Sequence, residues 1–397
     1  MTETNINKIK EVLTRGVERV IGERHLLNKL KSGKKLRIKH GIDPTGSKIH
    51  IGRAISLWKL RAFQDLGHQV VVIIGDFTAQ IGDASDKTAA RRPLSQAEIE
   101  KNMKDYKGQI GKILDLKKVE WRYNSQWLGK LTARDLVTIS MNFSAQQLIQ
   151  RRNFKERWEQ GKEIGLHELD YPLFQGYDSV AVRSDLEIGG ADQLFNLQVG
   201  RKMQEIFKQE PQDIMTFKML PGLDARKMST TWGNVVNITD SPDNIYGKIM
   251  SMKDELMLDY FELCTSLPLK DISKIKADLA KKRINPREVK AQLAREIVAL
   301  YHGGNAAQGA EKEFNLVFRE KALPSRLPAF RLPEKPINIL DLLIQAKLVS
   351  SKSEAKRLVL QKGVKINGQV EDDWQKTISP KKGTVIQSGK RKFLKII

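Results

Sequence analysis

The feature that most limits how this chain can fold is a strand–helix–strand pattern near its start. The apolar residues favour a short strand over Leu36–Ile42, a helix over Gly52–Asp65 and a buried strand over Val70–Ile74. These elements in this order are typical of a βαβ unit, which requires a parallel sheet with helices packed on its faces. A further strand is predicted over Val180–Ile188, where two glycines and a helical pattern follow it.

The pattern divides the rest of the chain into helical and basic parts. Apolar residues at helical spacing predict that residues 1–35 are helical, namely Ile6, Ile9, Leu13, Val17 and Val20. Further helices are predicted to begin at Pro242 and Pro286, since each proline follows a polar residue that can cap a helix. Closely spaced prolines then mark an extended linker, at Pro324, Pro328, Pro333 and Pro336.

We therefore expect a Rossmann-like α/β domain with a parallel sheet over residues 1–234, with an insertion at about 118–168. A helical domain would follow over 235–325, and a proline-rich linker over 326–336. Residues 337–397 would form a small α+β domain, in which the pattern predicts helices over Ile339–Ala346 and Ser353–Gln361 and then strands.

The chain carries a large excess of positive charge. It has 69 Lys and Arg against 47 Asp and Glu, a formal net charge of +22 and a pI of about 9.8. Such an excess favours polyanionic partners, nucleic acid first and an anionic membrane surface second. On composition alone, a basic surface without a function of its own is the alternative.

The composition also excludes several classes of protein. Cys264 is the single cysteine, so no internal disulfide can form, and six scattered histidines with one cysteine do not suit a zinc site. The longest strongly apolar run, Val70–Ile74, is far shorter than the roughly 20 residues of a membrane helix. Charged residues throughout the first 25 positions argue against a secretory signal, so we expect a cytoplasmic protein without a membrane partner.

Two short motifs carry groups that suit phosphate. The motif His50-Ile-Gly-Arg53 lies where a helix is predicted to begin, and a helix N-terminus presents free N–H groups to an anion. The motif Asp224-Ala-Arg-Lys-Met-Ser-Thr-Thr231 places a lysine and hydroxyls in a loop that could close over a phosphate chain. Alone, the first motif is better explained by ordinary helix capping and the second by a solvated basic loop.

Together with Gly189-Gly-Ala-Asp-Gln193, these motifs resemble the catalytic signatures of class I aminoacyl-tRNA synthetases. The stretch Tyr171-Pro-Leu-Phe-Gln-Gly-Tyr-Asp178 resembles the tyrosine pocket of the bacterial tyrosyl-tRNA synthetases, and Gly75-Asp-Phe-Thr78 resembles the signature of one branch of them. The likeness covers essentially the whole chain, in order. Its most specific part is the Tyr-X3-Gln-X2-Asp pattern, because tryptophanyl relatives do not share it.

The resemblance implies a role for each matching residue. Asp83, Tyr171 and Gln175 would accept hydrogen bonds from the substrate ammonium group. Asp178 would bond the phenol hydroxyl, which selects tyrosine because phenylalanine would leave a buried polar group unpaired. Gln193 would lie near the substrate carboxylate and the α-phosphate. The residues expected at the ATP site are Asp43, Thr45, His50, Gly52, Arg53, Lys87, Arg91, Gly190, Asp192, Lys227, Ser229 and Thr230, with Asp192 on the ribose.

Three positions depart from the family pattern. Arg53 stands where the family has the second histidine of His-X-Gly-His, and Thr230 where it has the second lysine of Lys-Met-Ser-Lys-Ser. Lys39 stands where some relatives hold the phenol hydroxyl with a tyrosine, so we include it among the candidate tyrosine-binding residues. The changes at the ATP site indicate either rebalanced electrostatics or a weakened activation step. We favour rebalancing, because the residues of the tyrosine pocket are intact.

The implied reaction uses L-tyrosine, ATP and the cognate tRNA, with Mg²⁺ bound mainly by the ATP phosphates and no structural metal held by the protein. The tyrosine carboxylate is already a nucleophile, so catalysis would consist of positioning and electrostatic stabilisation. In relatives the insertion forms the interface of a homodimer. Aromatic residues of the insertion agree with an interface or with an internal core, namely Trp121, Trp127, Phe143, Phe154 and Trp158.

The last segment resembles a small RNA-binding domain first known from a ribosomal small-subunit protein, through Ser353–Leu360 and Gly363–Gly368. The phosphate contacts expected there are Lys352, Lys356, Arg357 and Lys362. The helical middle of the chain would approach the tRNA anticodon arm. Two other functions stay open: a non-catalytic RNA-binding protein with a synthetase-like body, and an enzyme that passes activated tyrosine to another acceptor.

Overall fold

The computed structural model describes the chain except for residues 1, 84–93, 231, 321, 322, 324, 326, 332–335, 380, 390 and 391. The chain divides into two compact units. One comprises Met1–Ser241 and Lys248–Gly303, and the other Pro242–Gly247 and Gly304–Ile397. The domain limits expected from the sequence stay predictions.

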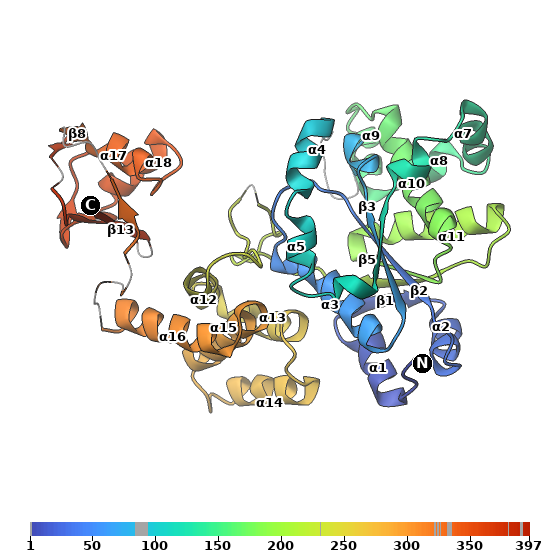
Figure 1. Cartoon of the computed structure of the whole chain (residues 1–397), viewed down its shortest axis with the longest axis horizontal. Coiled ribbons are helices and arrows are strands. Elements are labelled where there is room, and N and C mark those ends of the chain that lie inside the picture. The colour runs from blue at the N-terminus through green and yellow to red at the C-terminus, as the bar shows by residue number, and fades with distance from the viewer. Residues whose placement is uncertain are drawn as a thin grey trace. The chain divides into compact units, whose positions relative to one another are not determined.

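A six-stranded sheet forms the centre of the first unit (Figure 1). Its strand order is β1-β6-β5-β2-β3-β4, and every neighbouring pair is parallel except β1 with β6. The strands are β1 Val17–Ile21, β2 Arg37–Ile42, β3 Gln69–Ile74, β4 Val119–Tyr123, β5 Leu186–Gly190 and β6 Asp213–Phe217. From β2 the chain proceeds through β3 and β4 toward one edge of the sheet, whereas from β5 it proceeds to β6 in the opposite direction. In doubly wound sheets, ligands bind beyond the carboxyl ends of the strands at such a reversal.

Helices cover both faces of this sheet. Successive residues of β2 point to opposite faces: the side chain of Lys39 reaches α10 (Leu166–Val182), and that of His40 reaches α3 (Ile51–Asp65). Helix α11 (Leu194–Ile206) packs against β5 and β6. Because both faces are covered, β3 is an almost continuous buried apolar run, as the sequence predicts.

The first 35 residues contain a strand, so the prediction that they are helical is wrong in part. Helices α1 (Ile6–Thr14) and α2 (Glu23–Lys31) flank β1, which holds both Val17 and Val20. Gly16 lies between α1 and β1 with a φ of 65°, a conformation that breaks a helix and that glycine adopts without strain. The residues after it pair with β6, a distant segment that local periodicity does not reveal.

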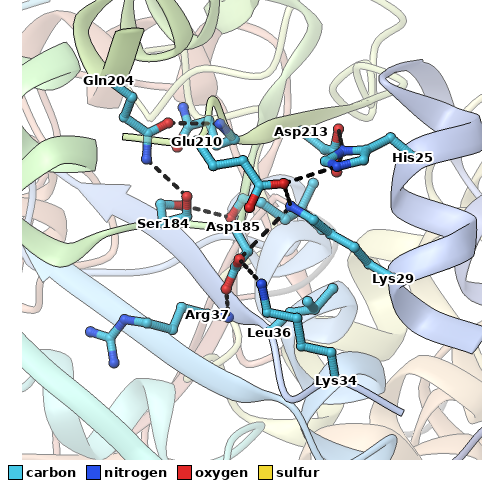
Figure 2. Close-up of polar contacts among 12 residues, drawn as sticks. His25, Lys29, Lys34, Leu36, Arg37, Ser184, Asp185, Gln204, Glu210 and Asp213 are labelled. Atoms are coloured by element: carbon cyan, nitrogen blue, oxygen red, sulfur yellow. Dashed lines mark hydrogen bonds and ion pairs between the residues drawn. The ribbon is translucent and has the colours of Figure 1, made fainter. Parts of the chain in front are cut away.

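Charged side chains attach α2 to the amino-terminal ends of the strands (Figure 2). His25 contacts the buried Asp213 and, through its other ring nitrogen, Glu210, at 3.0 Å each. Lys29 pairs with Glu210 at 2.9 Å, and Lys34 with Asp185 at 3.4 Å. Burial raises the pKa of Asp213. The cluster lies at the end of the sheet opposite to the carboxyl ends of the parallel strands, and we assign it a structural role.

The prediction of a strand over Val180–Ile188 is also wrong in part. Helix α10 continues to Val182 and ends where Arg183 adopts a left-handed conformation with a φ of 48°, and β5 begins only at Leu186. The apolar residues before Arg183 are buried as one face of a helix, and a short run of this kind cannot distinguish a helix from a strand.

Strand β4 lies within the range expected for the insertion and forms an edge of the central sheet. The helices that precede and follow β4 are η1 Thr78–Gln80, α4 Gln96–Met103, α5 Tyr106–Ile110, η2 Leu116–Lys118, α6 Ser125–Leu128, α7 Ala133–Ser140, α8 Ala145–Ile149 and α9 Arg152–Glu159. A 3-10 turn, η3 Ala191–Gln193, connects β5 to α11.

The helical region follows β6. Its helices are α12 Pro242–Met250, η4 Asp254–Leu256, α13 Met257–Cys264, α14 Leu269–Ala280, α15 Pro286–His302 and α16 Gly304–Phe318. The predicted starts at Pro242 and Pro286 are confirmed, and the side chain of Asn285 caps α15 by accepting a hydrogen bond from the N–H of Arg287.

The second unit ends in a small α+β fold. Its strands form a sheet in the order β10-β9-β12-β13-β7 and a separate pair, β11-β8. The elements are β7 Ala329–Phe330, β8 Ile337–Asn338, α17 Ile339–Gln345, α18 Lys352–Leu360, β9 Val364–Ile366, β10 Gln369–Glu371, β11 Thr377–Ile378, β12 Val385–Ser388 and β13 Lys392–Ile396. Both predicted helices are confirmed. The expected linker instead contributes β7, which pairs with β13.

Candidate active site

A cavity of about 810 Å³ lies at the carboxyl ends of the central strands. Its walls include residues that directly follow β2, β3 and β4, namely Asp43, Gly75 and Asn124, and the last residue of β5, Gly190. The position matches the reversal of strand order between β2 and β5. The fold therefore places one ligand site where the sheet topology predicts it.

A buried carboxylate forms one wall of the cavity. Asp178 of α10 is 3% exposed and accepts hydrogen bonds from Trp127 Nε1 at 2.8 Å and Asn124 Nδ2 at 3.3 Å. Burial raises the pKa of Asp178 to about 7, although Lys39 and the two donors act in the opposite direction. Each carboxylate oxygen has a second lone pair, so the group can accept a further hydrogen bond from a ligand.

A second carboxylate orients a tyrosine hydroxyl. Tyr171 donates to Asp43 Oδ2 at 2.9 Å, and Thr78 donates to Asp43 Oδ1 at 2.8 Å. Gly75 allows this approach, because a Cβ there would lie 1.9 Å from Asp43 Oδ1. Burial and the nearby carboxylates raise the pKa of Tyr171, so its oxygen stays protonated and can accept from a cation while it donates to Asp43.

Amide side chains connect the remaining residues of the predicted tyrosine pocket. Gln193 Nε2 donates to Asp83 Oδ2 at 2.6 Å. Asn196 Nδ2 donates to the side-chain oxygens of both Gln175 and Gln193, at 3.0 Å each. Arg151 lies 3.4 Å from Asp83 Oδ1. The structure thus brings Asp83, Gln175 and Gln193 into one network of polar contacts, and all three line the cavity.

The N-terminus of α3 forms another wall. His50 caps the helix, since its Nδ1 accepts from the N–H of Arg53 at 3.3 Å, which leaves the hydrogen of a neutral imidazole on Nε2. Burial, and to a lesser extent Arg53, lower the pKa of His50 to about 3, so the ring is neutral at physiological pH. Arg53 donates to the hydroxyl oxygens of Thr45 at 2.7 Å and of Tyr106 at 3.4 Å. Gly52 completes the wall, where a Cβ would lie 2.9 Å from Met228 Sδ.

The loop after β6 contributes Lys227 to the cavity. Asn234 braces this loop, because its amide donates to Asp224 at 2.8 Å and to the carbonyl oxygen of Lys227 at 3.0 Å, and accepts from the N–H of Ser229. Arg226 pairs with Asp224 at 2.6 Å. Ser229 and Thr230 lie on the same loop but are not among the residues that line the cavity.

The other predicted residues fall into three groups. Asp192 lines the cavity beside Gly190. Lys39 is fully buried behind the pocket wall, where its ammonium donates to the carbonyl oxygen of Gln175 at 2.9 Å. Lys87 and Arg91 lie outside the described residues.

The predicted RNA contacts cluster around α18 in the second unit. Lys352, Lys356 and Arg357 belong to this helix, and Lys362 follows it. Lys356 lies over the ring of Trp374, 3.8 Å from its centroid, and Lys352 pairs with Asp341 at 2.7 Å. The lysines thus extend along one helix and the turn after it, where they can meet a backbone of phosphates.

Sequence reasoning missed the residues that hold the site residues in place. Asn124, Trp127, Asn196 and Arg151 contact predicted site residues through the bonds described above. One signal was available: Asn124 directly follows β4, and residues at the carboxyl ends of parallel strands line the sites of such folds. Trp127 gave no comparable signal, because it was one of several aromatic residues in the insertion.

Comparisons with known proteins agree with this arrangement. The family model of the class I tRNA synthetases for tryptophan and tyrosine matches residues 31–319, so the chain belongs to that family. A model of the C-terminal domain of tyrosine–tRNA ligases matches residues 320–396. Within this family the chain belongs with the tyrosine–tRNA ligases, as the match to their C-terminal domain and the relatives described next show.

Two relatives are similar over nearly their whole length. The tyrosine–tRNA ligase of Moorella thermoacetica is 44% identical over 99% of this chain and 97% of its own. That of Thermotoga maritima is 44% identical over 97% of this chain and 96% of its own. A C-terminally truncated mitochondrial tyrosyl-tRNA synthetase from Aspergillus nidulans has the same fold, with a TM-score of 0.66 and 21% identity over 78% of this chain and 94% of its own.

The described residues contain no helix that is long and apolar enough to cross a membrane. They also contain no group of three or more His, Cys, Asp or Glu side chains arranged to hold a metal ion.

Proposed function

We propose that this protein attaches L-tyrosine to its cognate tRNA in two ATP-dependent steps. The observation that carries the proposal is the single cavity that joins a buried carboxylate, Asp178, to the N–H-rich start of α3 at His50. The carboxylate suits a phenol hydroxyl, and the helix start suits phosphate.

The pocket around Asp178 fits the polar groups of tyrosine. The phenol hydroxyl would donate to Asp178, and the ammonium group would donate to Asp83, to the oxygen of Tyr171 and to the amide oxygen of Gln175. The contact from Tyr171 to Asp43 supports this placement, because it leaves lone pairs of the Tyr171 oxygen for the ammonium group. Phenylalanine would lack the donor that Asp178 requires, so this end of the cavity would select tyrosine.

The other end of the cavity fits ATP. Thr45, His50, Arg53 and Lys227 would contact the phosphates, and Asp192 the ribose. Class I synthetases use ATP, and Mg²⁺ would arrive with its phosphates as part of the substrate. The tyrosine carboxylate would attack the α-phosphate directly and pyrophosphate would leave. No general base is needed, and the protein would act by alignment and by hydrogen bonds to the charge that develops.

The changes at Arg53 and Thr230 fit rebalanced electrostatics. Arg53 is anchored by the Tyr106 hydroxyl and donates to Thr45, so a fixed positive charge lies at the phosphate end of the cavity. This charge would offset the one that is absent at Thr230. Arg226 compensates less, because it is already paired with Asp224.

The experiment that tests the proposal is ATP–pyrophosphate exchange with each of the twenty amino acids, followed by charging of tRNA. Exchange with tyrosine alone, and then charging, is the expected result. Absence of exchange from a folded protein that binds tRNA would favour a non-catalytic RNA-binding role. Exchange without charging would favour a different acceptor for the activated tyrosine.

A homodimer is part of the proposal. Four large apolar side chains are exposed in this region. Leu136 and Val137 lie on α7, Met141 directly follows that helix, and Leu166 begins α10. A groove of about 280 Å³ lies beside them, lined by residues that include Leu173 and Phe174. Exposed apolar patches of this kind mark interaction surfaces. Light scattering that shows a monomer at working concentration would contradict the dimer.

We further propose that the small α+β fold at the C-terminus binds the tRNA through Lys352, Lys356, Arg357 and Lys362, in the cytoplasm where tRNA is charged. The net charge of +22 supports a polyanionic partner. Contacts of this type read shape and phosphate positions rather than sequence.

A further inference from the structure

A buried ion pair lies beside the predicted ammonium site, and one of its two residues, Glu187, is also among those that line the cavity. Lys39 of β2 and Glu187 of β5 are register partners in the parallel sheet, so their side chains share one face. Lys39 Nζ lies 2.9 Å from Glu187 Oε1, and the side chains are 0% and 1% exposed. Burial of two charges is costly unless their hydrogen bonds are satisfied. A pair at this position therefore calls for a functional explanation.

Every hydrogen of the Lys39 ammonium has a partner within 2.9 Å: Glu187, the hydroxyl of Ser179 and the carbonyl oxygen of Gln175. Glu187 in turn accepts from Gln175 Nε2 at 3.2 Å, from Ser179 at 3.0 Å and from Gln212 at 2.5 Å. Gln175 is thus held twice, by its main chain through Lys39 and by its side chain through Glu187.

The contact with Glu187 determines which end of the Gln175 amide faces the cavity. Because Nε2 is bound to Glu187, Oε1 points elsewhere, and it accepts from Asn196 while Gln175 lines the cavity. An amide turned the other way would present a donor, which would repel an ammonium group. The orientation matters only for ligands that carry this group.

We propose that Lys39 and Glu187 form a positioning pair that holds the amide oxygen of Gln175 toward the substrate ammonium group, and so sets the affinity for tyrosine. This inference rests on the proposed function, since it takes the cavity to bind tyrosine. Lys39 thus supports the pocket from behind and does not touch the phenol hydroxyl. Neither residue of the pair is hydrogen-bonded to Asp178. The charge of Lys39 lowers the pKa of Asp178 and that of Glu187 raises it, so removal of both charges together removes two opposing effects on the phenol site.

The test is a comparison of two ligands that differ in that group. Tyramine carries the ammonium group without a carboxylate, and 3-(4-hydroxyphenyl)propionate carries the carboxylate without an ammonium group. The variant Lys39→Met with Glu187→Gln removes both charges and keeps the volumes similar. Calorimetric titration of the full-length protein should show about tenfold weaker binding of tyramine, the size of one misplaced hydrogen bond to a charged group. Binding of the propionate should change less than twofold.

A matched control comes from a second buried ion pair, formed by Arg157 of α9 and Glu168 of α10. Arg157 and Glu168 lie 2.7 Å apart with side chains 2% exposed, and neither lines the cavity. The variant Arg157→Met with Glu168→Gln should bind both ligands as the parent protein does. It controls for the general effect of neutralising a buried pair that packs against α10.

The outcomes separate the inference from the function on which it rests. Equal weakening of both ligands, or no change for tyramine, would overturn the positioning role while leaving tyrosine binding intact. Failure of the parent protein to bind either ligand or tyrosine would instead overturn the proposed function, and the inference with it. If the double variant does not fold, Ser179→Ala provides the same comparison. It removes the hydroxyl between Lys39 and Glu187, and a two- to threefold loss for tyramine alone is expected.

Discussion

Replacement of Trp127 by phenylalanine should change the pH at which the protein gains activity. The indole Nε1 donates to Asp178 Oδ1 at 2.8 Å and so favours the charged carboxylate. A hydrogen bond to a charged group contributes about 1.5–3 kcal/mol, and one pKa unit corresponds to about 1.4 kcal/mol. Loss of the bond should therefore raise the pKa of Asp178 from about 7 by roughly one to two units.

The assay is kcat/KM for tyrosine in pyrophosphate exchange between pH 5.5 and 9. A phenol donates well only to the ionised carboxylate, so kcat/KM should rise with pH through the pKa of the free protein. The curve of Trp127→Phe should lie at higher pH, and its activity at pH 7 should be about tenfold lower. Phenylalanine keeps the contacts of this side chain with Val71, Ile73 and Val182, so the fold should be retained.

Trp121→Phe is the matched control, because Trp121 lies on β4, shortly before α6, and the indole that donates to Asp178 is that of Trp127. Its pH profile should coincide with that of the parent protein. Ionisation of the substrates affects all three proteins equally, so it cannot explain a shift seen in Trp127→Phe alone. Superimposable profiles for all three proteins would show that the indole does not stabilise the Asp178 carboxylate, and the assignment of the phenol site to Asp178 would lose its electrostatic basis.

Three further predictions concern the phosphate end and the RNA-binding fold. His50→Asn should keep the helix cap, and with it the melting temperature, but lower exchange about tenfold or more because the Nε2 donor is lost, whereas His50→Ala should also lose about 1 kcal/mol of stability in thermal unfolding. Between pH 5 and 6.5 the pH profile of exchange should have the same shape for the parent protein and for His50→Asn, since burial keeps the pKa of His50 near 3 and its ring is neutral throughout this range. Arg53→His combined with Thr230→Lys should not raise the exchange rate; a large gain would show that the native site is impaired. Arg357→Glu with Lys362→Glu should leave exchange unchanged but weaken tRNA charging, and should reduce the salt slope of tRNA binding by roughly two; an unchanged slope would exclude these residues as phosphate contacts.

The parts of the fold that could be predicted are those governed by local pattern. Strands β2 and β3, helix α3 between them and the capped start of α15 follow from apolar periodicity and from proline at the first helical position. Strand β1 could not be predicted, because it exists through pairing with β6 at the far end of the sheet. The end of α10 was equally hidden, since a buried helix and a buried strand leave the same apolar run.

A similar division holds for the candidate site. Motif resemblance pointed to many of the residues that line the cavity, among them Asp178, Gln175 and His50, because their chemistry is tied to their spacing in the sequence. It assigned Asp43 to the ATP site, but the contacts of Asp43 with Tyr171 and Thr78 emerge only in three dimensions. The resemblance placed Lys39 near the phenol hydroxyl but gave no sign of its ion pair with Glu187. Its charge becomes intelligible only because β2 and β5, which are far apart in the chain, are neighbours in the sheet.

The state of Asp178 shows why the supporting residues matter as much as those that touch the ligand. Burial alone would neutralise this carboxylate, and Trp127, Asn124 and the more distant Lys39 together offset only part of that cost. The carboxylate would therefore be stabilised by a further donor. A phenol hydroxyl would supply that donor and a phenyl ring would not, so discrimination would arise from the incomplete compensation of the burial of Asp178. By this reasoning, a variant that adds a protein donor to Asp178 should bind phenylalanine no better and tyrosine less well, because the phenol would then have to displace a partner that is already satisfied.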